Sequence, residues 1–216
     1  MKSLTNLLRQ TAAGLRVLLV MTVLLGVLYP LAVWGVTRLP GLRDNAEGSI
    51  VRVNDTAAGS ELIGVDPVDP RAKDDPTADR WFHTRPSATV PPADGQSQLG
   101  PDDVLPSGGS NKAGDNDDLR KAVEERRAAV AARERVDPAR VPADAVTASA
   151  SGLDPHISRD YAELQAPRVA RENGIPEQRV RDLVAEHTQG RPLGVLGEPG
   201  VNVTTLNLAV QREAGR

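Results

Sequence analysis

Cysteine is absent from this chain of 216 residues. Its absence excludes disulfides, thiolate metal ligands and a cysteine nucleophile, and leaves the redox compartment undecided. Aromatic side chains are scarce, with two Trp, two Tyr and one Phe, and Tyr29 and Trp34 lie in an apolar run near the start. Only Trp81, Phe82 and Tyr161 remain for a core of Val, Leu, Ile and Ala, so we expect that core to be modest.

A strongly basic charge is also lacking. The formal net charge is −3, and no acidic residue precedes Asp44, so the part of the chain after the apolar run is more acidic than the whole. This balance offers no basic surface of the kind that binds nucleic acid. We therefore expect no nucleic-acid partner.

Patterns typical of metal sites and hydrolases are missing as well. His83, His156 and His187 lie far apart and have no partner at metal-ligand spacing, so no metal site is expected. The serines of residues 107–111, with Asp154 and His156, supply the residue types of a hydrolase triad, but no G-x-S-x-G elbow is present. A membrane-anchored hydrolase is thus a minor alternative.

Long apolar runs are absent except for one, Val17 to Thr37, which Arg16 precedes and Arg38 follows. As a helix rising about 1.5 Å per residue, it spans about 30 Å, the thickness of a bilayer's hydrocarbon core. A cleaved signal peptide is the alternative. The run exceeds a typical signal core of about 7 to 15 residues, and no A-x-A-like site follows it. We predict a retained single-pass transmembrane helix over residues 17–37.

The flanking charges predict an orientation. Lys2, Arg9 and Arg16 precede the span, and three arginines follow it at similar distance. The positive-inside rule therefore gives only a slight preference for a cytoplasmic N-terminus. The predicted arrangement is a short basic cytoplasmic tail at residues 1–16 and a soluble extracytoplasmic domain at residues 38–216.

The domain mixes strand and helix signals, which indicates an α+β fold with long irregular loops. Ser49–Val53 and Glu61–Val65 flank a turn-rich segment and predict a hairpin. Residues 84–116 are rich in Pro and Gly and are expected to form an irregular loop. Residues 144–148 are expected to be extended. Alternating apolar residues over 203–210 predict a closing strand.

Three helices are expected in the domain. Asp117–Arg135 carries a thin apolar stripe that Arg126 interrupts, which indicates a well-solvated helix. Ser158 fits the N-cap of a second helix that Pro167 bends and that ends at Asn173-Gly174. A third helix opens at Pro176 and shows apolar residues at i, i+3, i+4 and i+7 from Val180 to His187.

The segment Ser107-Gly108-Gly109-Ser110-Asn111 is the most conspicuous glycine-rich motif. Its backbone N–H groups suit an anion, but it lacks the lysine, strand and helix of a phosphate-binding loop. Its residues favour a flexible turn.

Four separated motifs together resemble the C subunit of the Kdp-type potassium-transporting ATPase. They are Ser107-Gly108-Gly109-Ser110-Asn111; Val146 to Ser158, which includes Ser151, Gly152, Asp154, Pro155 and His156; Gln165-Ala166-Pro167-Arg168-Val169-Ala170; and Leu196-Gly197-Glu198-Pro199 with Val201-Asn202-Val203 and Leu206-Asn207-Leu208-Ala209. Their order and spacing are similar, as are Tyr29-Pro30 in the span and Phe82-His83. The resemblance covers nearly the whole chain.

The resemblance implies a non-catalytic subunit of a high-affinity, ATP-driven potassium uptake pump in the inner (cytoplasmic) membrane. Its partners would be a P-type ATP-hydrolysing subunit, a channel-like potassium-conducting subunit and a small single-span subunit. The family's C subunit is described as a catalytic chaperone that aids assembly and raises the ATP affinity of the hydrolysing subunit. No firmly bound cofactor is implied, and ATP would be met in a transient ternary complex. The alternative is an anchored extracytoplasmic binding or sensor module.

The resemblance also implies a role for one glutamine. In the family, the glutamine of the Q-x-P-R-V-A motif is proposed to touch the nucleotide, and here it is Gln165. Arg168 follows by one helical turn, shares its face and would reach a phosphate or an acidic partner surface. An equally weighted alternative is that Gln165 braces the helix at Pro167. Direct contact with cytoplasmic ATP conflicts with the predicted extracytoplasmic domain, so the effect on affinity is either indirect or the orientation is reversed.

The transmembrane segment has its own candidate interface. Thr22 and Gly26 give a small-xxx-small spacing that allows close helix approach. Pro30 leaves the Gly26 carbonyl without its helical partner. We expect Thr22, Gly26 and Pro30 to mark a face that docks on another subunit.

Overall fold

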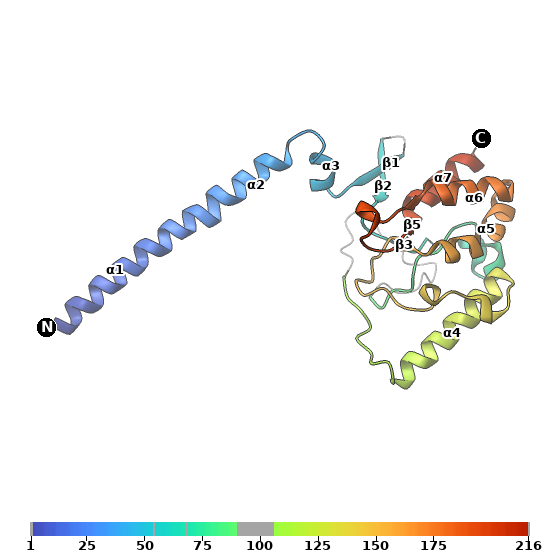
Figure 1. The fold of residues 1–216 in the computed structure, drawn as a ribbon, viewed down its shortest axis with the longest axis horizontal. Helices are drawn as coiled ribbons and strands as arrows, with labels where there is room; N and C mark the ends of the chain where they lie inside the picture. The colour runs from blue at the N-terminus through green and yellow to red at the C-terminus, as the bar shows by residue number, and fades with distance from the viewer. Residues whose placement is uncertain (1, 54, 68, 90–105, 216) are drawn as a thin grey trace. The chain divides into compact units, whose positions relative to one another are not determined.

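The computed structural model describes residues 2–53, 55–67, 69–89 and 106–215. The chain forms two units, residues 1–49 and residues 50–216. The first holds the long helix near the N-terminus, and the second holds all the strands of the described chain (Figure 1).

The first unit is dominated by one long, continuous helix. It consists of α1 (Lys2–Val23), a π-helical turn (Leu24–Leu28) and α2 (Tyr29–Thr37). Its stretch Ser3–Thr37, of 35 residues, is long and apolar enough to cross a membrane, and none of it is buried within the protein. The predicted helix over residues 17–37 is confirmed as a helix, and the basic segment before it is helical too.

The π-helical turn has a local cause in the sequence. Pro30 has no N–H, and its ring crowds the carbonyl four residues earlier, that of Gly26. Just before it, the N–H of Tyr29 bonds to the carbonyl of Leu24, five residues back. A turn of this width inserts one extra residue into the ladder. The helix thereby continues through Pro30.

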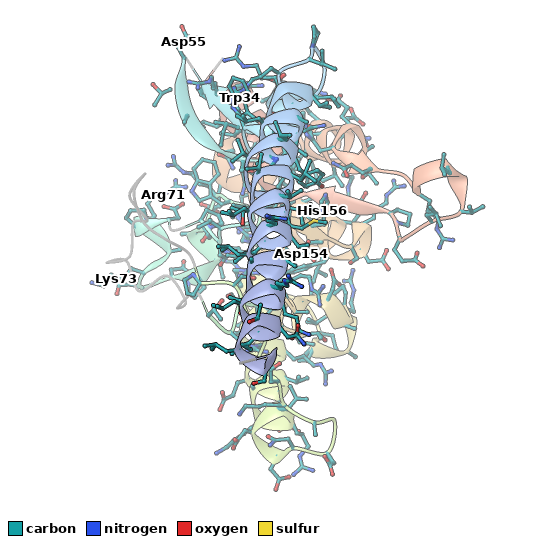
Figure 2. The ribbon with its side chains drawn as sticks, turned by 90° about the vertical axis from the view of Figure 1, so that its left-hand side faces the viewer. Trp34, Asp55, Arg71, Lys73, Asp154 and His156 are labelled. Carbon is teal, nitrogen blue, oxygen red and sulfur yellow. The ribbon has the colours of Figure 1, made fainter. Side chains whose placement is uncertain are left out.

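Polar contacts mark the end of this helix. The Arg38 guanidinium lies over the Trp34 ring at 5.0 Å (Figure 2), and it pairs with Glu47 at 2.8 Å. Glu47 follows the short helix α3 (Arg43–Ala46). These contacts hold together the segment that follows the long helix.

The second unit opens with the predicted hairpin. Strands β1 (Ile50–Val53) and β2 (Thr56–Ser60) pair antiparallel, with one register shift after Val51. Asp55 lies at its tip with a φ of 63° (Figure 2). The hairpin is confirmed, but the return strand begins directly after the tip and not at Glu61. The turn is therefore tighter than the polar sequence suggested.

A second small sheet is formed from distant segments. Its strands are β3 (His156–Ile157), β5 (Gly200–Asn202) and β4 (Thr188–Gln189), in the order β3-β5-β4 and antiparallel. Together with the helices described next, it confirms the α+β fold.

The three predicted helices are present, and their caps follow the sequence signals. They are α4 (Asp117–Glu134), α5 (Arg159–Asn173) and α6 (Glu177–Glu186). The Ser158 hydroxyl accepts from the N–H of Tyr161 at 3.0 Å at the start of α5. Gly174 ends α5 with a φ of 66°, a conformation that glycine adopts without a steric penalty.

Short 3₁₀ turns connect these elements. They are Pro70–Ala72, Pro76–Ala78, Pro138–Arg140, Ala143–Ala145 and Pro192–Gly194. The Ala143–Ala145 turn contradicts the extended segment predicted at residues 144–148. The predicted irregular loop at 84–116 falls partly outside the described residues. Its described parts, residues 84–89 and 106–116, contain no helix or strand.

The predicted closing strand at residues 203–210 is wrong, because this segment is the helix α7 (Val203–Ala214). Asn202 ends β5, and its side chain caps α7 by accepting from the N–H of Thr205 at 3.1 Å. Val203, Leu206 and Val210 are buried at helical spacing. Burial of this helical face overrides the apparent alternation of the sequence.

The core is small and mainly aliphatic, as expected. It is built around α5, α6, α7 and the small sheet, with Phe82 as a wholly buried aromatic residue (Figure 1). Alanines on α5 let these elements approach closely, since Ala162 and Ala166 have no exposed surface.

A glycine fixes how the chain after the hairpin meets the turn at residues 153–155. The Gly64 N–H donates to the Leu153 carbonyl at 2.8 Å. A Cβ at residue 64 would lie 2.7 Å from the Cα of Pro155 and would also meet the Asp154 carbonyl. These are backbone atoms, so relieving the clash would require the chain at Asp154 and Pro155 to shift.

We predict that Gly64→Ala destabilises the chain by about 1–3 kcal/mol, as overpacking does. The measurement is denaturant unfolding of the full chain in detergent. Gly190→Ala is the control, because a Cβ there has no neighbour within 4 Å. Equal unfolding midpoints for the two variants would contradict the prediction.

Candidate functional site

The glycine-rich motif at residues 107–111 packs against the turn at residues 149–152. The Gly108 N–H donates to the Ser151 carbonyl at 2.8 Å, and the Ser107 hydroxyl donates to the same oxygen at 3.0 Å. A Cβ at Gly109 would lie 3.0 Å from the Ala150 carbonyl. Ser110 and Asn111 are exposed. The two motifs thus form one interlocked pair of turns.

The second of these turns leads into β3. The Asp154 carboxylate accepts from the His156 N–H at 2.9 Å and from Arg85 at 3.3 Å. The His156 ring nitrogen Nδ1 lies 3.5 Å from Asp154 Oδ1 (Figure 2), and the Pro155 carbonyl accepts from the N–H of Val203 at 2.9 Å. The motif residues therefore position strand β3 and the start of α7.

Gln165 is wholly buried and pairs with the backbone of His83. Its Oε1 accepts from the His83 N–H at 2.8 Å, and its Nε2 donates to the His83 carbonyl at 3.3 Å. Asn207 pairs with the backbone of Phe82 in the same way: its Oδ1 accepts from the Phe82 N–H and its Nδ2 donates to the Phe82 carbonyl, both at 2.8 Å. Two side-chain amides thus stand in for a neighbouring β-strand.

Arg168 is also buried, with 1% of its surface exposed. Its Nε donates to the two Glu134 carboxylate oxygens at 2.9 and 3.1 Å. One terminal nitrogen donates to the carbonyls of Asp79 and Trp81, and the other to Gln165 Oε1 at 3.2 Å. The structure therefore brings Gln165 and Arg168 together, as their spacing predicted, and directs both into the protein.

An ionic cluster continues from this pair. His83 Nδ1 lies 3.0 Å from Asp66 Oδ2, and its Nε2 lies 3.1 Å from Asp79 Oδ2. Arg133 donates to Glu134 at 2.7 Å and to the Tyr161 hydroxyl at 2.8 Å. Among the residues that the structure describes, no group of three His, Cys, Asp or Glu has a geometry that holds a metal ion.

The cluster shifts several pKa values. Burial and the charge of Arg133 lower the pKa of His83, but Asp66 and Asp79 raise it by more, so the net pKa is above its ordinary value. Burial raises the pKa values of Asp66 and Asp79, yet their interactions with His83, with backbone N–H groups and with nearby arginines together outweigh burial and lower both pKa values. The protonated form of His83 and the ionised forms of Asp66 and Asp79 are therefore favoured.

Two neighbouring groups shift as well. Burial raises the pKa of the Tyr161 phenol, although Arg133 opposes this shift. Burial lowers the pKa of Arg133, but the surrounding Tyr161 and Glu134 raise it above its ordinary value. Arg133 therefore keeps its charge within the domain.

A cavity of about 270 Å³ adjoins this cluster. Its lining combines basic and polar groups with aliphatic side chains. The lining residues are Gly64, Asp66, His83, Thr84, Arg85, Pro86, Ser87, Arg126, Ala129, Val130, Arg133, Ala145, Gly152 and Tyr161. The arginine that interrupts the predicted apolar stripe of α4, Arg126, thus lines a cavity instead of only facing solvent.

Sequence reasoning missed the charged partners in this region. Glu134 and Asp66 show no local motif, because their partners Arg168 and His83 lie 34 and 17 residues away along the chain. Asp79 lies only four residues before His83, a local spacing that sequence reasoning did not use. Arg126 did leave a signal, since it falls where an apolar residue was expected.

The predicted transmembrane residues lie in the first unit. A Cβ at Gly26 would lie 3.9 Å from Thr22 Cγ2, so the two residues share a face of the helix. The Thr22 hydroxyl donates to the Leu18 carbonyl at 2.8 Å. The helix thus places Thr22 and Gly26 on the same side, and Pro30 follows the π-helical turn. Their role as an interface stays a prediction.

We predict that Arg168→Met lowers the free energy of unfolding by about 3 kcal/mol, since it leaves buried carbonyls unpaired and removes one partner of a buried ion pair. The measurement is denaturant unfolding of the full chain in detergent. Arg127→Met, at an exposed position of α4, should change stability by no more than about 0.5 kcal/mol. A similar small effect at Arg168 would show that its contacts are dispensable.

Comparison with known proteins agrees with these motifs. The family model described as "KdpC: K+-transporting ATPase, c chain" matches residues 11–212. A potassium-transporting ATPase KdpC subunit from Kineococcus radiotolerans is 50% identical over 212 residues, which cover 98% of both chains. KdpC subunits from Streptomyces avermitilis and Bradyrhizobium diazoefficiens are 45% and 40% identical, over 97% of this chain and 96% and 100% of theirs. The chain therefore belongs to the KdpC family, the C chain of the potassium-transporting ATPase.

Proposed function

We propose that this potassium pump subunit is non-catalytic, aids assembly, and raises the ATP affinity of the hydrolysing subunit through protein contacts. In this proposal Gln165 and Arg168 do not touch the nucleotide. The burial of both side chains carries the argument. Their polar groups are engaged by the His83 backbone, by the carbonyls of Asp79 and Trp81, and by Glu134.

The cost of exposing these groups supports an indirect role. A nucleotide could reach Gln165 only if the segment around His83 left its place, which would leave buried backbone groups unpaired. A phosphate on Arg168 would have to displace Glu134, a carboxylate with no exposed side-chain surface. Leaving such a buried charge without its partner is strongly unfavourable.

The proposed orientation favours the same conclusion. With a cytoplasmic N-terminus, the domain lies outside the membrane, whereas ATP is inside the cell. An effect on ATP affinity would then pass through the membrane helix and the partner subunits. Those partners are the P-type hydrolysing subunit, the channel-like potassium-conducting subunit and the small single-span subunit.

An apolar loop between β4 and β5 supports a docking role. Leu193, Val195 and Leu196 are 89%, 75% and 56% exposed, and the loop projects from the domain (Figure 2). Arg191 and Glu198 pair at 2.6 Å across its base. Exposed aliphatic groups of this kind are typical of surfaces that another protein covers.

The arrangement of the serines supports a non-catalytic role. The Ser107 hydroxyl is bonded to the Ser151 carbonyl, and Asp154 pairs with Arg85 and with the N–H of His156. These groups hold turns together. They are not aligned as nucleophile, base and orienting acid.

The decisive experiment measures the apparent ATP affinity of the purified pump with Gln165→Glu. A direct contact with phosphate would turn into repulsion and raise KM by about tenfold or more, the worth of a charge-assisted hydrogen bond. We expect KM per intact complex to stay within about twofold of wild type. Pump lacking this subunit should show a raised KM if it assembles; an unchanged KM there would refute the chaperone role.

The membrane helix offers a test of the assembly role. Gly26→Leu adds bulk to the face shared with Thr22 and should lower the yield of partner subunits that co-purify, because small residues allow close helix approach. Ala13→Leu is the control, since nine residues at 3.6 per turn place it opposite Thr22 on α1. Equal yields for the two variants would make the segment a plain anchor.

A further inference from the structure

The cavity between α4 and residues 83–87 gathers more positive groups than the domain's own pairs neutralise. Arg85, Arg126 and Arg133 line it, together with His83, whereas Asp66 is the acidic residue of its lining. The Asp66 carboxylate is already engaged by His83 and by the N–H of Thr84 at 2.8 Å. Asp66 also interacts electrostatically with Arg133, but it forms no ion pair with Arg85 or Arg126.

The three arginines differ in how far they are satisfied. Arg133 is held by Glu134 and Tyr161. The terminal nitrogens of Arg85 bond to Asp154 and to two backbone carbonyls, but its Nε is buried and has no hydrogen-bond partner among the described residues.

Arg126 is the least compensated of the three. One of its terminal nitrogens donates to the Val146 carbonyl at 3.1 Å. No carboxylate of the described residues pairs with it. A partly buried guanidinium without a counter-ion attracts an anion, since the low local dielectric strengthens the pairing.

The rest of the wall is apolar. Ala129, Val130 and Ala145 line the cavity beside the Tyr161 ring. Such a surface favours a ligand with a short hydrocarbon part next to its charge. The few free donors suit a monoanion, since a phosphate monoester carries about −1.5 to −2 charges and three acceptor oxygens.

We propose that this cavity binds a carboxylate group, held by Arg126 beside the positive charge of Arg85, with its hydrocarbon part against Ala129 and Val130. The carboxylate comes either from a small free organic acid or from an Asp or Glu side chain that a partner subunit inserts. The site is separate from the proposed effect on ATP affinity, and its failure would leave that proposal untouched.

The first arm of the test uses the full chain in detergent. Sodium propionate, compared with sodium chloride at equal ionic strength, should raise the melting temperature, because a ligand that binds only the folded state stabilises it. Arg126→Met should weaken propionate binding at least about tenfold, whereas Arg127→Met should bind like wild type.

A second variant is needed because Arg126→Met could lose propionate binding simply by failing to fold. Ala129→Leu keeps every charge and fills the apolar side of the cavity, and leucine suits a helix. It should abolish the response to propionate. The proposal is overturned if propionate stabilises wild type no more than chloride does, or if the cavity variants and Arg127→Met respond alike.

The second arm uses the purified pump and identifies the source. If a partner's side chain fills the cavity, propionate should not stabilise the intact pump, and Arg126→Met should reduce co-purification of partner subunits relative to Arg127→Met. If the ligand is a free acid, propionate should stabilise the pump as well, with co-purification unchanged. A pump that shows neither response contradicts the proposal.

Discussion

The backbone of residues 80–84 crosses the domain without a neighbouring strand, and the structure depends on how its polar groups are satisfied. Its five consecutive N–H groups all donate to side chains: to Asp79 just before the segment, and to Asp69, Asn207, Gln165 and Asp66 from farther along the chain, at 2.7 to 3.1 Å. Its carbonyls accept from Asn173, Arg168, Asn207 and Gln165. Buried backbone groups must be paired, and here side chains supply what a sheet supplies in other folds.

This constraint explains several features that otherwise look unrelated. The buried Arg168–Glu134 ion pair joins α5 to the end of α4, and Arg168 also donates to the Trp81 carbonyl within residues 80–84. The His83 ring lies between Asp66 and Asp79, which also accept from the backbone of that segment. Loss of one partner would orphan the others, so the cluster behaves as a cooperative unit whose charged groups are mutually required.

The same arrangement distinguishes polar groups whose hydrogen bonds are all made within the domain from polar groups that are left to bind a ligand. Gln165 and Arg168 resemble ligand contacts by residue type and motif, but their hydrogen-bonding capacity is used internally. Arg126 is not satisfied in this way, and it borders the adjoining cavity together with Arg85. This cavity and the exposed loop at residues 193–196 are the features on which the proposed contacts with other molecules rest.

The sequence by itself determined the elements whose signals are local: the long N-terminal helix, the hairpin, α4 to α6 with their caps, and the family through its motifs. It misled at residues 203–210, where alternation is visible locally but the Asn202 cap and the buried face of Val203, Leu206 and Val210 decide for a helix. Only the tertiary structure brought Glu134 to Arg168, Asp66 to His83, and Arg126 to its cavity. The physical reason is that caps and periodicity act within a few residues, whereas the pairing of a buried polar group depends on partners that folding brings from distant parts of the chain.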